Sequence, residues 1–224
     1  KKERKKERKK ERKTLNMSML DRFFSIKYKG QDEIFHGLNI WKEEKFRKLQ
    51  GTYPVIFLSF AGIKETNYPM TIRRFSEIMQ TEYIKNYFLL KSDVLTEGEK
   101  KAFKQMADHM EPEDAPMALH RLSDYLCRFY GKKVIILLDE YDTPLQEAYV
   151  GGYWNELVSF TRNLFNNTFK TNPYLERAIM TGVTRVSKES LFSDLNNLNV
   201  VTTTSNEYAS CFGFTEEEVF RAMD

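Results

Sequence analysis

Three short apolar runs divide the chain: residues 55–60 (VIFLSF), 134–138 (VIILL) and 177–183 (RAIMTGV). Strands that are apolar on both faces are typical of parallel sheets covered by helices on each side. Between these runs, apolar residues recur at helical spacing. Strands that alternate with helices in this way predict a doubly wound α/β fold with a mainly parallel sheet.

The helical patterns begin at residues 14–24 and continue with a short helix around residues 41–49. Thr96 and Glu99 have the spacing of a capping box, which predicts a helix through about residue 110. Residues 142–144 look like a turn, residues 200–204 like a last strand, and Thr215 with Glu218 like a second capping box. Three further helices are predicted by apolar stripes: Ile72, Phe75, Met79 and Tyr83; Leu119, Leu122, Leu126 and Phe129 behind Pro116; and Trp154, Leu157, Thr161 and Leu164.

The composition fits one globular domain. Apolar residues make up 41% of the 224 residues, and aromatic residues make up 14%, which suffices for a sizeable core. No apolar run approaches the ~20 residues that a membrane helix needs. Cys127 and Cys211 have no paired or metal-like spacing, so we expect reduced thiols in a cytoplasmic protein.

The basic charge is concentrated at the N-terminus. Residues 1–12 are three copies of Lys-Lys-Glu-Arg, and residues 1–13 carry ten Lys or Arg and three Glu. The remaining residues carry 25 basic and 29 acidic groups, so the body gives no reason to expect a nucleic-acid surface. The repeat itself is a solvated helix, a disordered segment, an artefact of the reading frame, or a tail that binds nucleic acid or a membrane. The first residue is not Met, so we expect a fragment or a processed product.

The strongest chemical signal is the run from Val134 to Asp142, in which apolar residues precede Asp139 and Glu140. This is the Walker B form. A buried parallel strand delivers its C-terminal end to the ligand crevice, where Asp139 can hold Mg²⁺ and Glu140 can act as general base on water. Asp142 is a possible outer-shell carboxylate. The alternative is a strand that simply ends in solvated acids.

Two other segments contain candidate residues for phosphate binding and catalysis. Lys13 and Thr14 open a helix as in a phosphate loop, but residues 1–12 contain no glycine. Thr181 ends a strand and can sense a γ-phosphate or position water, and Arg185 beyond it can neutralise charge in the transition state. The alternative for these two residues is an ordinary turn with a surface arginine.

Five longer segments together resemble the bacterial AAA-ATPase-like family: TLNMSML, YPVIFLSF, VIILLDEYDTPL, NPYLERAIMTGVTRVSKESLFSDLNNL and FGFTEEEV. The resemblance covers residues 13–224. It implies a P-loop NTPase-type three-layer αβα fold that binds ATP and Mg²⁺, often joined to a C-terminal nuclease domain. It further implies phosphate binding by Lys13, metal binding by Thr14 and Asp139, catalysis by Glu140, and a sensor segment that contains Thr181 and Arg185.

The chain departs from that family at its N-terminus. The repeat stands where the family has a phosphate loop, RPRRFGKT, and a preceding strand that lies centrally in the sheet. We therefore expect a partial domain, less stable than its parent, with weak nucleotide binding. Three functions remain open: an ATP-hydrolysing module that regulates an attached or partner effector such as a nuclease, a non-hydrolysing scaffold, and nucleic-acid binding through the basic N-terminus.

Overall fold

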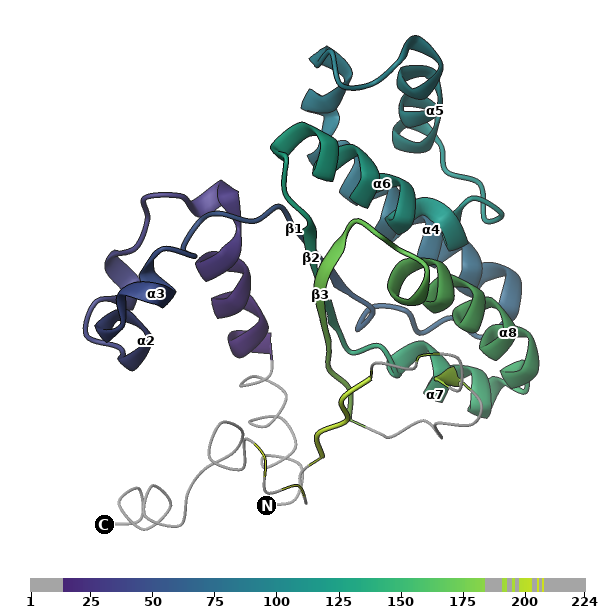
Figure 1. The fold of residues 1–224 in the computed structure, drawn as a ribbon. Coiled ribbons are helices and arrows are strands. Elements are labelled where there is room, and N and C mark those ends of the chain that lie inside the picture. The colour runs from purple at the N-terminus through teal and green to yellow at the C-terminus, as the bar shows by residue number, and fades with distance from the viewer. Residues whose placement is uncertain are drawn as a thin grey trace.

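The computed structural model describes residues 14–183, 191–192, 195, 198–202, 205 and 207. Their centre is a parallel three-stranded sheet with the order β1 (Val55–Ser59), β2 (Val134–Asp139) and β3 (Leu175–Met180). Helices cover both faces of this sheet (Figure 1). The α/β fold class predicted from the alternation of apolar runs is therefore confirmed.

The helices follow the predicted stripes closely. A first helix covers residues 14–24, as expected. The others are α2 (Asn39–Lys42), α3 (Glu44–Arg47), α4 (Tyr68–Lys85), α5 (Glu97–Asp108), α6 (Ala115–Tyr130), α7 (Thr143–Gly151) and α8 (Trp154–Phe165). Shorter turns of helix are η1 (Ile26–Tyr28), η2 (Glu33–Phe35), η3 (Tyr87–Lys91) and the π-helical η4 (Asn166–Lys170).

Two helix predictions need correction. The single helix expected around residues 41–49 is broken into α2 and α3, because Glu43 has extended backbone angles (φ −106°, ψ 121°). The turn expected at residues 142–144 is the start of α7, with Pro144 in its first turn. Proline is well tolerated there because the first N–H groups of a helix have no partner within the helix.

The sheet separates two hydrophobic clusters. On one face, Ile136 and Leu138 of β2 pack with residues of α4, α6 and α8. On the other face, Ile135 and Leu137 pack with Met17 of the helix at residues 14–24. Successive side chains of a strand point to opposite faces, so β2, whose six residues are all buried, contributes to both clusters. The result is a three-layer arrangement (Figure 1).

The third strand is more exposed than its sequence predicts. It ends at Met180 and not at residue 183, and residues 176–179 are all exposed, with Ile179 at 40%. The expectation that this strand is covered on both faces is therefore wrong for the described part of the chain. Strand position alone is not the reason, because β1 is also an outer strand and is largely buried; residues 176–179 belong to neither hydrophobic cluster of the described chain.

Local signals at the helix ends are also present. The capping box is formed as predicted: Thr96 Oγ1 accepts the N–H of Glu99, and the Glu99 carboxylate accepts the N–H of Thr96. Residues 200–202 are not a strand, while residues 203–204 and the expected capping box at Thr215 and Glu218 lie outside the described residues.

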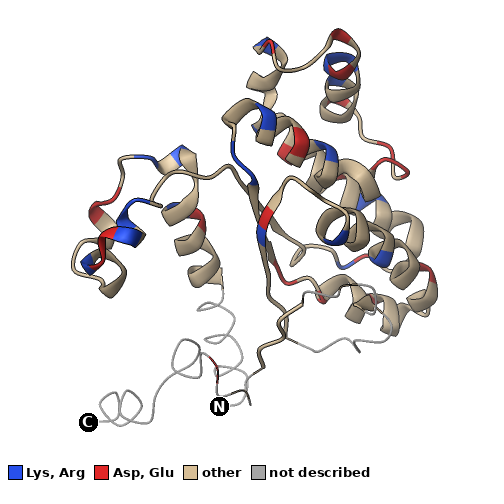
Figure 2. Ribbon diagram, in the orientation of Figure 1, with Lys and Arg blue, Asp and Glu red and all other residues tan. Residues whose placement is uncertain are grey.

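Charged residues of both signs occur along the described helices. Lys and Arg are interspersed with Asp and Glu along the helices (Figure 2). Within the described ranges, no helix is long and hydrophobic enough to span a bilayer.

Candidate functional site

Asp139 lies at the C-terminal end of β2, with only 2% of its surface exposed. Each of its carboxylate oxygens accepts a hydrogen bond from a threonine hydroxyl. Thr14 Oγ1 donates to Oδ2 over 2.9 Å, and Thr181 Oγ1 donates to Oδ1 over 2.5 Å. Three segments that are far apart in the sequence therefore meet at one carboxylate, at the sheet edge where parallel α/β folds bind ligands.

The placement of the predicted site residues is clear for four of the six. Thr14 lies in the first helix and donates directly to Asp139, while Thr181 follows β3. Glu140 is adjacent to Asp139 in the chain. Lys13 and Arg185 lie outside the described residues.

Glu140 occupies an unusual backbone conformation. Its φ of 55° is the one positive value among the described residues other than glycine, in a region that L-amino acids with a Cβ rarely adopt. The side chain is 4% exposed, and its Oε2 accepts a hydrogen bond from Thr143 Oγ1 over 3.1 Å. The backbone thus turns sharply after Asp139 and enters α7 within three residues.

Asp142 connects this turn to the segment after β3. Its Oδ2 accepts hydrogen bonds from the backbone N–H of Val183 over 2.9 Å and from Gln146 Nε2 over 2.8 Å. Gly182 lies so close that a Cβ there would be 2.7 Å from Asp142 Oδ1. Asp142 is fully buried, so its contacts place the carboxylate against residues 182–183.

Backbone hydrogen bonds complete this connection. The N–H of Thr181 donates to the carbonyl of Leu138 over 2.9 Å, and the N–H of Tyr141 donates to the carbonyl of Thr181 over 3.0 Å. Thr181 was predicted as a site residue, whereas Gly182 and Gln146 were not. The available signal for Gly182 was an isolated glycine at the end of a strand pattern, which often marks a close approach of another segment.

The donor set at Asp139 consists of oxygen atoms, which suits a hard cation. Mg²⁺ is commonly held by one or two carboxylates together with water and substrate phosphates, so a full protein cage is unnecessary. Among the described residues no group of three His, Cys, Asp or Glu side chains could hold a metal by itself. One carboxylate and one hydroxyl, from Asp139 and Thr14, therefore fit Mg²⁺ that arrives with a phosphate ligand.

Comparison with known proteins identifies the family of this chain. An uncharacterised protein encoded in the vnfD 5′ region of Azotobacter chroococcum mcd 1 is 36% identical over 90 residues, which are 40% of this chain and 17% of that protein. The matching part is thus a small fraction of that relative's length. No solved structure matches the chain significantly. The model of a family described as predicted AAA-ATPase matches residues 10–192, and the chain accordingly belongs to this predicted AAA-ATPase family.

Proposed function

We propose that this domain binds ATP with Mg²⁺ and hydrolyses it, and thereby regulates an attached or partner effector such as a nuclease. The observation that carries the proposal is the convergence of Thr14, Thr181 and Asp139 at the end of a buried strand, with Glu140 as the next residue. Family membership supports ATPase chemistry in general. The reduced state expected for the cysteines supports a cytoplasmic location.

The metal-binding role falls to Asp139 and Thr14. Thr14 is the first described residue of the helix at residues 14–24, and we propose that the N-terminal end of this helix faces phosphate, as in a phosphate loop. Mg²⁺ held there would neutralise charge on the phosphates. Lys13, the residue before Thr14, is proposed to contact the phosphates as a point charge.

The hydrolytic role falls to Glu140. Its carboxylate is proposed to accept a proton from water as the water oxygen bonds to the γ-phosphorus. The bond from that phosphorus to the bridging oxygen of ADP breaks, which releases phosphate and ADP. Thr181 is proposed to orient the water or the γ-phosphate, and Arg185 to neutralise charge that develops on the transferred group.

The alternative within the same fold is a non-hydrolysing scaffold or regulatory module with a degenerate phosphate loop. It is favoured by one feature of the sequence, the absence of glycine from residues 1–12. Backbone amides wrap a phosphate most readily where glycines allow close approach. Nucleotide binding and hydrolysis therefore have to be measured separately.

The decisive experiment combines calorimetric titration of Mg-ATP with release of inorganic phosphate. We expect Glu140→Gln to retain ATP binding and to lose hydrolysis by about 100-fold or more, as for removal of a general base. Asp139→Asn should weaken binding in the presence of Mg²⁺ much more than in its absence. Glu77→Gln makes the matching change on an exposed part of α4 and should alter neither quantity.

The outcomes separate the two functions. Binding without measurable hydrolysis by the unaltered chain would select the module without turnover. Hydrolysis at an undiminished rate in Glu140→Gln would exclude its role as base. Absence of Mg-ATP binding to the unaltered chain at millimolar concentration would overturn the proposed ATPase and favour the scaffold.

A further inference from the structure

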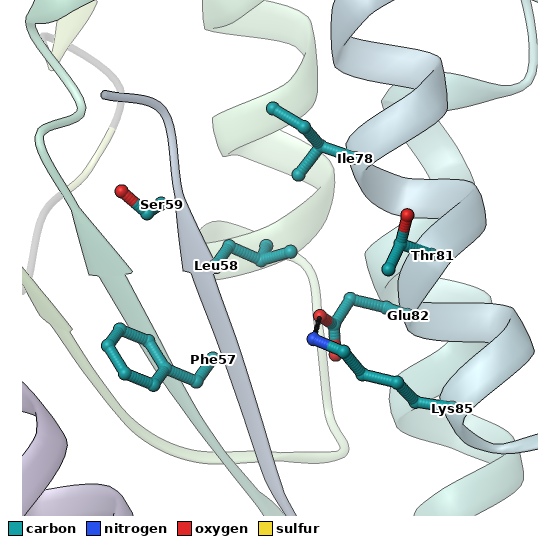
Figure 3. A pocket seen from close by; sticks show the side chains of 7 residues that line it. All are labelled: Phe57, Leu58, Ser59, Ile78, Thr81, Glu82 and Lys85. Atoms are coloured by element: carbon teal, nitrogen blue, oxygen red, sulfur yellow. Dashed lines mark hydrogen bonds and ion pairs between the residues drawn. The ribbon is translucent and has the colours of Figure 1, made fainter. Parts of the chain in front are cut away.

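Four acidic side chains are buried among the described residues: Glu82, Asp139, Glu140 and Asp142. The chemistry proposed above uses Asp139 and Glu140. Glu82 lines a cavity of about 280 Å³ between β1 and α4, where Lys85 of the same helix pairs with it over 2.5 Å (Figure 3). A neighbour on its own helix therefore accounts for the burial of Glu82. Asp142 differs, because its carboxylate contacts a segment 41 positions away.

The position of Asp142 in its helix does not explain this contact. Asp142 is the N-cap residue of α7, where an aspartate commonly accepts an N–H from the first turn of its own helix. Its side chain makes no such capping bond. Instead, Oδ2 accepts the N–H of Val183 over 2.9 Å, with Gln146 Nε2 as a second donor over 2.8 Å. The carboxylate thus holds the segment after β3 and does not cap α7.

The segment held by Asp142 begins with Thr181. The carbonyl of Thr181 accepts the N–H of Tyr141 over 3.0 Å, and the bond from the N–H of Val183 to Asp142 follows two residues later. Gly182 lies between these two bonds, and a Cβ there would be 2.7 Å from Asp142 Oδ1. Asp142 therefore packs directly against the backbone that carries the Thr181 side chain.

The orientation of Thr181 determines which oxygen of Asp139 is engaged by the sheet. The Thr181 hydroxyl donates to Asp139 Oδ1, while the hydroxyl of Thr14 donates to Oδ2. Oδ2 is thus the oxygen beside Thr14, the other residue proposed to hold Mg²⁺. The Thr181 oxygen can still accept a hydrogen bond from water. Outer contacts of this kind orient metal-binding side chains and tune their affinity for the metal.

We propose that Asp142 is a positioning residue that keeps the Thr181 hydroxyl on Asp139 Oδ1. It does so by holding the backbone at Val183 against the start of α7. Oδ2 then remains beside Thr14 for Mg²⁺. The metal part of this inference rests on the ATPase function proposed above. Asp142 acts through an accepted hydrogen bond and not through its charge, so an amide oxygen in its place should serve, whereas an outer-shell carboxylate would need the charge.

The first readout needs no nucleotide. The side-chain carboxyl carbon of Asp139 is followed by carbon-13 NMR in the whole chain, and Thr181→Val gives the shift that loss of the hydroxyl produces. Asp142→Ala should move this resonance in the same direction. The double variant should move it no further than Thr181→Val alone, because both changes remove one contact. Asp142→Asn, whose side-chain oxygen can still accept the N–H of Val183, should keep the resonance near its unaltered position.

The second readout is the affinity for ATP, measured by calorimetry with Mg²⁺ and in EDTA. Asp142→Ala should weaken Mg-ATP binding by about tenfold or more, as for other outer contacts to a metal ligand, and should leave the affinity in EDTA unchanged. Asp142→Asn should restore most of the Mg-ATP affinity. The matched control is Asp114→Ala at the N-cap of α6, where an aspartate also precedes a proline by two residues and makes no side-chain capping bond. It should alter neither readout.

The outcomes distinguish this inference from the proposed function. An Asp139 resonance that Asp142→Ala leaves in place overturns the positioning role, whether or not the chain binds ATP. Asp142→Asn behaving like Asp142→Ala overturns it as well, because the charge would then be what matters. Absence of Mg-ATP binding to the unaltered chain rejects the ATPase and the metal role, while the resonance still decides the contact. If Asp142→Ala does not fold, Val183→Pro removes the donor at a residue that is 50% exposed and must shift the same resonance.

Discussion

Thr14 and Asp139 are 125 positions apart in the chain, yet the hydroxyl of the first donates to the carboxylate of the second over 2.9 Å. This contact joins the first described residue of the helix at residues 14–24 to the end of the central described strand. The contact places Thr14 beside Asp139, and these are the two residues proposed to hold Mg²⁺. A metal bound between them would replace a hydrogen bond that already fixes their spacing.

The second hydroxyl on Asp139 gives a direct test of the site. Thr181→Val keeps the side-chain shape but removes the donor to Asp139 Oδ1. A buried acceptor that loses its partner costs roughly 1–3 kcal/mol, so urea unfolding should show a loss in this range. Thr81→Val, which alters an exposed hydroxyl on α4, should change the unfolding free energy by less than about 0.5 kcal/mol. Equal effects of the two changes would contradict the importance of the Asp139 contact.

The close approach of Gly182 to Asp142 predicts a steric effect. Gly182→Ala would place a methyl group 2.7 Å from Asp142 Oδ1 and 2.9 Å from a ring carbon of Tyr141. Overpacking of this kind costs roughly 1–3 kcal/mol. We expect a lower midpoint of urea unfolding. We also expect faster hydrogen exchange at the amide of Val183, whose N–H donates to Asp142 Oδ2.

A matched control is available at Gly98, which lies inside α5 with no atom within 4 Å of an added Cβ. Gly98→Ala should stabilise the protein by roughly 0.5–1 kcal/mol, because alanine is the better helix former. If Gly182→Ala stabilised the protein in the same way, the packing described around Asp142 would be incorrect.

The buried hydroxyl of Tyr83 predicts a different loss. It donates to the carbonyl of Ala118 over 2.9 Å and so joins α4 to α6, and burial raises the pKa of Tyr83 above its usual range. Tyr83→Phe should lower the unfolding free energy by about 1 kcal/mol. Tyr149→Phe, at a residue that is 76% exposed, should have almost no effect in the same urea titration.

The ion pair between α5 and α6 predicts a dependence on pH. A hydrogen bond from Arg128 lowers the pKa of Glu99, with a further contribution from the backbone of Thr96. A carboxyl group with a lowered pKa stabilises the folded state above its unfolded pKa of roughly 4.3, and this stabilisation is lost as the pH falls through the folded value.

We therefore expect Glu99→Gln to be less stable than the unaltered protein at pH 7, by less than about 1 kcal/mol because the pair is solvent-accessible. The difference should shrink as the pH falls below roughly 4.3. Unfolding at a series of pH values measures it, and Glu113→Gln provides an exposed control. A difference that grew on acidification would show that the ion pair does not stabilise the fold.

The parts of the fold that could be predicted are those fixed by short-range patterns. The run VIILL before Asp139 identified a buried strand, and the stripe from Ile72 to Tyr83 identified α4, because burial imposes a period on the sequence. The capping box at Thr96 was equally local. Family resemblance added Thr14, which residue patterns alone did not distinguish from chance.

The remaining features depend on contacts between distant segments. Ile179 is exposed because it packs in neither hydrophobic cluster of the described chain, and no pattern within the strand encodes this. The hydrogen bond from the N–H of Val183 to Asp142 spans 41 positions, and the bridge between Ser25 and Tyr53 joins segments on either side of η1, η2, α2 and α3. Such contacts are chosen by packing of the whole domain.

The left-handed backbone at Glu140 lowers the stability of the fold at a residue whose side chain is proposed to activate water. Glutamate in this conformation costs roughly 1–2 kcal/mol, whereas glycine adopts it freely. Glu140→Gly should therefore yield a more heat-resistant protein that lacks the acid proposed to activate water. A library screened for thermal tolerance alone would enrich this exchange, and its most robust members would be the ones that turn over no nucleotide.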